Sequence, residues 1–159
     1  MIDQSGNLWV WGRNDFAQLG LGDRVDRDTP VMLPVPAAAT RWTLVAAGPN
    51  FALALADSDK LYAWGVNDRG QLGIGSDGGD YGVPMRIQNP PFVTKWKWVS
   101  CGSGHCEALT TDGRLYARAI TRMGNSASGI RSIRLRRKKW SSQPASPRGP
   151  QLQPALATR

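Results

Sequence analysis

The sequence of 159 residues contains a single histidine, two cysteines and no long apolar run. No stretch approaches the ~20 apolar residues that a membrane-spanning helix requires, and the first residues lack the basic and apolar regions of a secretory leader. No cluster of His, Cys and carboxylates has metal spacing, and no glycine-rich loop precedes a helix to hold phosphate. We therefore expect no membrane segment, no metal, no cofactor, no enzyme active site and, by default, a cytoplasmic location.

The two cysteines, Cys101 and Cys106, stand five residues apart. In one extended segment an odd separation places side chains on opposite faces, so we expect this pair to be poorly placed for a disulfide. Free buried thiols in a reducing compartment are the simpler interpretation. His105, between them, completes only three possible zinc ligands, so packing or a hydrogen bond is the expected role of its side chain.

Acidic residues are absent from the last quarter of the chain. Residues 1–117 hold ten Lys and Arg with all twelve acidic residues, a net charge of −2, whereas residues 118–159 hold ten basic residues and none that is acidic. The overall charge of +8 would suggest an anionic partner such as nucleic acid. Because the positive charge belongs to the tail alone, the folded part gives no support for that partner.

What the sequence does contain is turn-forming residues and tryptophan, with 18 Gly, 11 Pro and seven Trp. This composition favours short strands separated by turns. The segments 7–11, 42–46 and 51–55 have the alternation of strands and are bounded by Gly, Pro, Asn or Asp. We expect an all-β protein, with about four strands in each structural unit.

A repeat runs through residues 2–117. The segment WGRNDFAQLGLG recurs as WGVNDRGQLGIG, and after a one-residue insertion the match resumes at Pro30 and Pro84. A third copy opens as TTDGRLYA and breaks off at Arg118. The glycines of the motif indicate turns or close backbone approach, and Gln18 and Gln71 are suited to satisfy the backbone groups of those turns. The residues that we assign to this structural signature are Trp11, Gly12, Asn14, Gln18, Leu19, Gly20, Gly22, Gly48, Trp64, Gly65, Asn67, Gln71, Leu72, Gly73, Gly75, Gly102 and His105.

The two motifs, WGxNxxxQLGxG and a later VxxGxxHxxAL, resemble the repeat of the regulator of chromosome condensation family. The first copy departs from it, because Ala17 replaces a glycine and Phe51 stands where the second copy has His105. The resemblance implies a β-propeller, typically of seven blades. It predicts two four-stranded blades and the start of a third, which is too little to close a ring, so we expect a fragment of a larger propeller that is marginally stable alone.

Recurrence also decides how the tryptophans and acidic residues are interpreted. Trp11 with Trp64, and Trp42 with Trp96, hold equivalent places in the repeat, which favours packing between blades over a stacking platform for ligands. The acidic run Asp23, Asp26 and Asp28 and the segment 76–82 are expected to face solvent between strands, where a propeller carries binding residues.

We divide the chain into propeller repeats at 1–117 (2–55, 56–109 and the opening 110–117) and a tail at 118–159. The tail, with its basic cluster at 134–139, is either a nucleic-acid-binding arm, a disordered terminus without a partner, or out-of-frame translation. Joining the last base of each codon to the first two of the next permits GNNAYGQLGIG from residue 118 onward, the missing third signature. This favours the frameshift and makes nucleic acid an unlikely partner.

Four functions remain open for the repeats. The first is a protein-interaction module, since the family binds partners through the loop faces of the propeller and no catalytic chemistry is present. The resemblance also implies guanine-nucleotide exchange on a small GTPase, as in the founding member, or, from a related propeller type, inhibition of an enzyme by covering its active site. A non-functional truncated product is the fourth. The partner's identity is not indicated.

Overall fold

The computed structural model of the chain describes residues 1–68, 70–76, 78–93, 95–119 and 131–133, with 118, 119 and 131–133 described by their main chain only. Its regular elements are all strands, as the sequence predicts, and the described residues include no helix able to cross a membrane. The strands are β1 (Leu8–Gly12), β2 (Arg27–Leu33), β3 (Trp42–Ala47), β4 (Phe51–Ala56), β5 (Leu61–Val66), β6 (Asp80–Arg86), β7 (Trp96–Cys101), β8 (His105–Thr110), β9 (Leu115–Ala119) and β10 (Arg131–Ile133).

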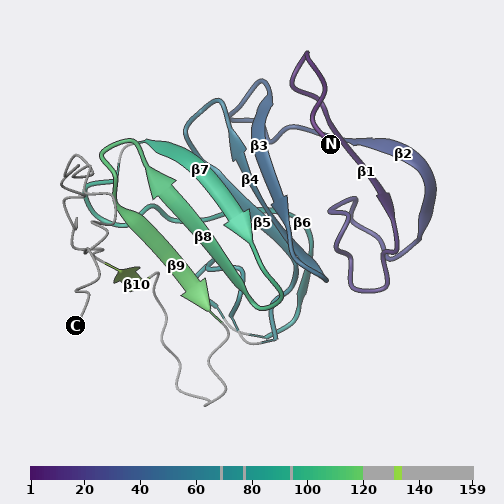
Figure 1. Ribbon diagram of the computed structural model, residues 1–159. Coiled ribbons are helices and arrows are strands. Elements are labelled where there is room, and N and C mark those ends of the chain that lie inside the picture. Colours follow the sequence, from purple (N-terminus) through teal and green to yellow (C-terminus); the bar gives the residue numbers. More distant parts are fainter. Residues whose placement is uncertain (69, 77, 94, 120–130, 134–159) are drawn as a thin grey trace, which may run out of the picture.

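The strands form three antiparallel sheets that lie side by side (Figure 1). The first sheet pairs β1 with β2, the second has the order β3-β4-β5-β6, and the third has the order β10-β9-β8-β7. The sheets do not coincide with the sequence repeats, because β3 and β4 come from the first repeat whereas β5 and β6 come from the second. Each four-stranded sheet is therefore assembled across a repeat boundary.

The second and third sheets have the same register. Leu55 pairs with Leu61 in the β4–β5 hairpin, and Leu109 pairs with Leu115 in the β8–β9 hairpin. In the third sheet β9 runs to Ala119, and β10 pairs with it. Apart from these few residues, the expected disorder and frameshift of 118–159 lie outside the part of the chain that the structure describes.

Two apolar clusters fill the junctions between the sheets. β5 is buried on both faces: Tyr62 and Trp64 belong to the cluster shared with the first sheet, and Leu61 and Ala63 to the cluster shared with the third. This alternation follows from the period of two along a strand. Trp42, Trp64 and Trp96 are buried, as expected for packing between blades.

The same expectation is wrong for Trp11, whose surface is 47% exposed. Its equivalent, Trp64, is 1% exposed because the first sheet covers it. Trp11 lies on the opposite face of that first sheet, and no described element packs over it. Recurrence in the sequence identified the equivalent position but not the neighbour that buries it.

The expectation of free thiols is also wrong, since Cys101 and Cys106 form a disulfide. The residues do not share one strand: Cys101 ends β7 and Cys106 lies in β8, so the hairpin places them directly opposite one another with their Cα atoms 4.1 Å apart. In the second sheet the equivalent pair is Ala47 and Ala52. The turn between the cysteines converts an odd spacing along the chain into a cross-strand pair.

Candidate interaction face

The two copies of WGxNxxxQLGxG form equivalent loops, one between β1 and β2 and the other between β5 and β6. Each loop opens with a glycine in the left-handed region, Gly12 at φ 101° and Gly65 at φ 97°. The departure at Ala17 leaves this geometry unchanged, because Ala17 holds φ 57° where Gly70 holds φ 68°. The loops therefore keep one backbone course despite the substitution.

A fully buried asparagine organises each loop from within. The Asn14 Oδ1 atom accepts a hydrogen bond from the Leu19 amide at 2.9 Å, and its Nδ2 donates to the Asp23 carbonyl at 2.9 Å. Asn67 does the same with the Leu72 amide at 3.1 Å and the Ser76 carbonyl at 2.9 Å. The asparagine amide carries a separate donor and acceptor atom on a short stem, so one side chain makes both bonds at once. This explains why asparagine recurs here.

The glutamines also act within the loops. Gln18 Oε1 accepts from the Phe16 amide at 2.9 Å, as expected for a residue that satisfies the turn, whereas Gln71 Nε2 donates to Asp68 at 2.8 Å. Leu19 and Leu72 are buried beside them. Gly22 and Gly75 hold φ 87° and 91°, which fits the expected turns.

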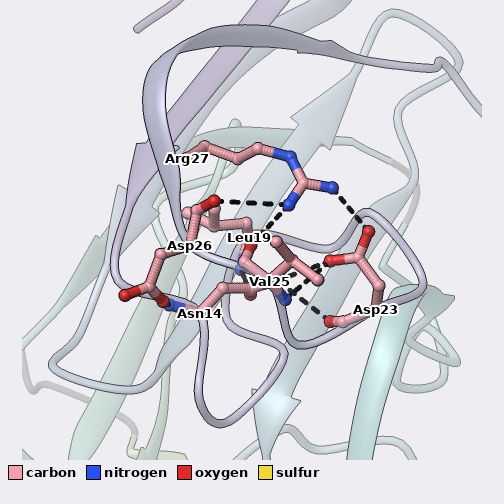
Figure 2. A network of polar contacts seen from close by, with 6 residues as sticks. All are labelled: Asn14, Leu19, Asp23, Val25, Asp26 and Arg27. Carbon is pink, nitrogen blue, oxygen red and sulfur yellow. Dashed lines mark hydrogen bonds and ion pairs between the residues drawn. The ribbon is translucent and has the colours of Figure 1, made fainter.

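An acidic network closes the first loop (Figure 2). Asp26 accepts from the Asn14 amide at 2.7 Å, and Asp23 binds Arg27 at 2.5 Å while accepting from the Val25 amide at 3.0 Å. The hydrogen bond from Val25 and the guanidinium of Arg27 hold the pKa of Asp23 below its ordinary value. Two members of the acidic run thus stabilise the loop, a role that the sequence analysis missed.

The first loop is fixed to the second sheet by three polar contacts. The Gly22 amide donates to the Gly82 carbonyl at 2.7 Å, and Arg24 pairs with Asp80 at 2.8 Å. The Trp64 indole donates to the Gln18 carbonyl at 2.9 Å. The first loop and the start of β6 consequently form one surface, which we call the loop face and define as residues 13–26 and 78–82.

Several side chains of the loop face are free of the core. Phe16 is 37% exposed and Val25 61% exposed, and the side chains of Arg13, Asp15 and Arg24 are largely open to solvent. Basic and acidic groups alternate with these apolar ones, so the face has no single sign of charge. Such a mixed patch on a fixed scaffold suits contact with another protein.

In the later motif, VxxGxxHxxAL, an aromatic ring packs against the glycine. The Phe51 ring lies so close to Gly48 that a Cβ there would be 2.6 Å from it, and the His105 imidazole stands 2.5 Å from the same position on Gly102. The Gly48 and Gly102 amides donate to the carbonyls of Phe51 and His105, both at 2.8 Å. His105 therefore occupies the position of a packing residue, and the described residues contain no group of three His, Cys, Asp or Glu that could hold a metal.

Comparison with known proteins agrees with this geometry. A family model described as the regulator of chromosome condensation (RCC1) repeat matches residues 5–55 and 58–109. The ultraviolet-B receptor UVR8 of Arabidopsis thaliana is 39% identical over 134 residues, and a protein RCC2 homolog of Xenopus laevis is 36% identical over 118 residues. These alignments cover 83% and 74% of the chain but only 30% and 22% of the relatives.

Solved structures share the fold. Human WBSCR16 superposes with a TM-score of 0.71 at 22% identity, and yeast RCC1 (Prp20) bound to Kap60 with a TM-score of 0.68 at 22% identity. Each match covers 83% of this chain and 34% of the other. Prp20p of Saccharomyces cerevisiae, characterised for its binding to Gsp1p and histones, superposes with a TM-score of 0.61 at 26% identity over 74% of this chain and 30% of that one.

Proposed function

Because this chain belongs to the family of regulator of chromosome condensation (RCC1) repeats, we propose that it is a protein-interaction module whose loop face contacts the partner. The observation that carries the proposal is that polar contacts hold the loop face against the second sheet. Arg24, Gln18 and Gly22 are bound to the second sheet, while Phe16 and Val25 remain exposed beside them. A surface that is already ordered loses little conformational entropy on binding.

The rest of the repeat signature is a scaffold in this proposal. Asn14, Asn67 and the loop glycines set the backbone, and the buried tryptophans join the sheets. We propose that residues 1–117 act as the repeat unit and that 118–159 contribute nothing to binding. Since the chain spans less than a third of UVR8 and of the RCC2 homolog, the working surface is proposed to be part of a larger propeller.

The partner is proposed to be a protein with both apolar and charged groups at its contact, matching the composition of the loop face. Among the structural neighbours, yeast RCC1 (Prp20) is bound to Kap60, and Prp20p is characterised for its binding to Gsp1p and histones. These three proteins are therefore rational probes for this chain. Nucleic acid is not proposed as a partner, because residues 1–117 carry a net charge of −2.

The test measures binding of the full chain to purified Kap60, Gsp1p and core histones, each separately, by biolayer interferometry. We expect the Phe16→Ser/Val25→Ser double variant to weaken binding at least tenfold. Phe92→Ser is the matched control, because Phe92 is 89% exposed but lies in the β6–β7 connection, at the opposite end of the second sheet from the loop face. Binding to none of the probes, or binding that only Phe92→Ser weakens, would contradict the proposal.

Guanine-nucleotide exchange, the second function implied by the resemblance, is separable from simple binding. A small GTPase loaded with a fluorescent guanine nucleotide would release it faster in the presence of the chain if exchange occurs. We propose binding without exchange, so the expected release rate is unchanged.

A further inference from the structure

The disulfide between Cys101 and Cys106 joins β7 to β8 next to the turn of their hairpin. Only four residues lie between the two cysteines, so the bridge restrains the unfolded chain less than one that closes a long loop. Its contribution to the stability of the fold is correspondingly small. A reason other than stability is therefore needed for this pair of cysteines.

The β3–β4 hairpin of the second sheet is the same structure without a bridge. Ala47 and Ala52 stand opposite one another at the positions that the two cysteines occupy in the third sheet. The Gly48 amide closes this turn by donating to the Phe51 carbonyl at 2.8 Å, and the β7–β8 turn has the equivalent bond, also at 2.8 Å. Because an unbridged hairpin with this register forms in the same chain, we expect the pairing of β7 with β8 to persist when the disulfide is open.

The two cysteines have different surroundings. Cys101 is half-buried, whereas Cys106 is 8% exposed and packs into the cluster between the second and third sheets. Beside Cys106 lies a hollow of about 30 Å³, which the second loop borders with Gln71 and Leu72. A space of this size holds about one water molecule. A reductant in solution therefore meets Cys101 first, and the Cys106 sulfur has room to move once the bond is broken.

Leu72 links the disulfide to the second loop. Its side chain is 3% exposed and lines the hollow together with Cys106, and its amide donates to Asn67 Oδ1 at 3.1 Å. The first loop has the equivalent bond, from the Leu19 amide to Asn14 at 2.9 Å, but this loop docks on the second sheet, whose β3–β4 hairpin carries no cysteine. We therefore expect a change at the bridge to reach the second loop and to leave the first loop unchanged.

We propose that this disulfide is a redox site, at which a dithiol reductant opens the bridge in the folded protein and thereby loosens the second loop. A thiolate of the reductant attacks the Cys101 sulfur, the S–S bond breaks, and Cys106 leaves as a thiolate that takes a proton from water. The second thiol of the reductant then attacks the mixed disulfide and releases Cys101. The protein gains two electrons and two protons, and the reductant becomes a disulfide. A low-molecular-weight disulfide closes the bridge again by the reverse exchange.

The test incubates the full chain with dithiothreitol under native conditions and counts by mass spectrometry the cysteines that iodoacetamide modifies. We expect both cysteines to be modified in the folded protein, and neither without dithiothreitol or after oxidised glutathione has replaced it. Hydrogen exchange of the same samples should be about tenfold faster, or more, at the Leu72 amide of the reduced protein and unchanged at the Leu19 amide. Modification that requires urea, equal exchange of Leu72 in the two redox states, or loss of protection at Leu19 on reduction would each overturn the proposal.

A cysteine-free variant shows whether the response belongs to this bridge. Cys101→Ala/Cys106→Ala gives the β7–β8 hairpin the same pair of residues as the β3–β4 hairpin. Its Leu72 amide should exchange at one rate with and without dithiothreitol. Cys101→Ser, which keeps the Cys106 thiol but cannot form the bridge, makes the same comparison if the double variant fails to fold. A dithiothreitol-dependent change of Leu72 exchange in either variant would show that the reductant acts elsewhere and would refute the assignment.

Discussion

The indole Nε1 of Trp64 donates a hydrogen bond to the carbonyl oxygen of Gln18 at 2.9 Å, across the junction between the first and second sheets. The two residues lie 46 positions apart and belong to different copies of the same motif. The tryptophan that opens one signature is thus held by the loop of the preceding signature. One motif serves both to shape a loop and to dock the next sheet on it, which explains why its residues recur together.

Removing this indole donor should loosen the junction. Trp64→Phe leaves the partly buried Gln18 carbonyl without its donor and leaves part of the ring's volume empty, so we expect a loss of about 2–4 kcal/mol in the free energy of unfolding. Trp11→Phe is the matched control, because Trp11 is exposed, and it should change stability by less than about 0.5 kcal/mol. Urea unfolding followed by circular dichroism measures both, and equal losses in the two variants would contradict the assigned role of Trp64.

The glycines that open the two loops offer a second matched pair. A Cβ on Gly65 would lie 2.3 Å from the Asn50 carbonyl oxygen and 2.7 Å from the Phe51 Cα, whereas a Cβ on Gly12 meets nothing within 4 Å. Both residues have positive φ, so both alanine variants are strained, but only Gly65→Ala also collides with β4. We expect a loss of about 1–2 kcal/mol for Gly12→Ala and of about 3 kcal/mol or more for Gly65→Ala. A similar melting temperature for the two variants would show that the backbone of β4 yields easily.

The buried asparagines should matter for order in the loops as well as for stability. Asn14→Ala and Asn67→Ala each leave a buried amide, of Leu19 or Leu72, without its acceptor, which predicts a loss of about 1–3 kcal/mol. Asn14 also donates to the Asp23 carboxylate at 3.0 Å, so its replacement should disturb the loop face more. Hydrogen exchange measures this directly. We expect the Leu19 amide to lose its protection in Asn14→Ala and to keep it in Asn67→Ala, and the reverse for Leu72.

Much of this arrangement follows from the sequence because it repeats. The spacing of Trp42 and Trp96 predicts equivalent buried places, and the turn residues around Phe51 predict a strand that begins there. The sequence also predicts that Gln18 serves its own turn, and the Phe16 amide is its partner. Each of these three features depends on contacts within one repeat, or on a contact with the adjacent repeat that recurs in both copies.

The wrong or missed assignments depend on contacts that the repeat does not supply. Trp11 has the same local sequence as Trp64, but no sheet of the described residues covers it. The repeat pattern alone therefore predicts a buried side chain, whereas the side chain is exposed. Cys101 and Cys106 meet only because a hairpin turn lies between them, and the first repeat, with alanines at the equivalent positions, gives no hint of a bridge. The pairing of Arg24 with Asp80 joins the first loop to the start of β6 in the next repeat. Charge and spacing along the chain do not reveal such a contact.

Asp3 gives a pH prediction at the start of the chain. Its carboxylate accepts hydrogen bonds from the Trp9 indole at 2.9 Å and from the Asn7 side chain at 3.0 Å, and these bonds, with main-chain amides, lower its pKa from 3.8 to about 2. Because the pKa is lowered in the folded state, the stabilisation is complete above pH 3.8 and is lost as the pH falls through about 2. We expect the Trp9 indole proton to shift with that midpoint in an NMR titration and to stop titrating in Asp3→Asn. The Trp64 indole, bound to a carbonyl, is the internal reference for an intact fold. A Trp9 midpoint near 3.8 with the Trp64 signal unchanged would show that these hydrogen bonds do not hold the Asp3 carboxylate in solution.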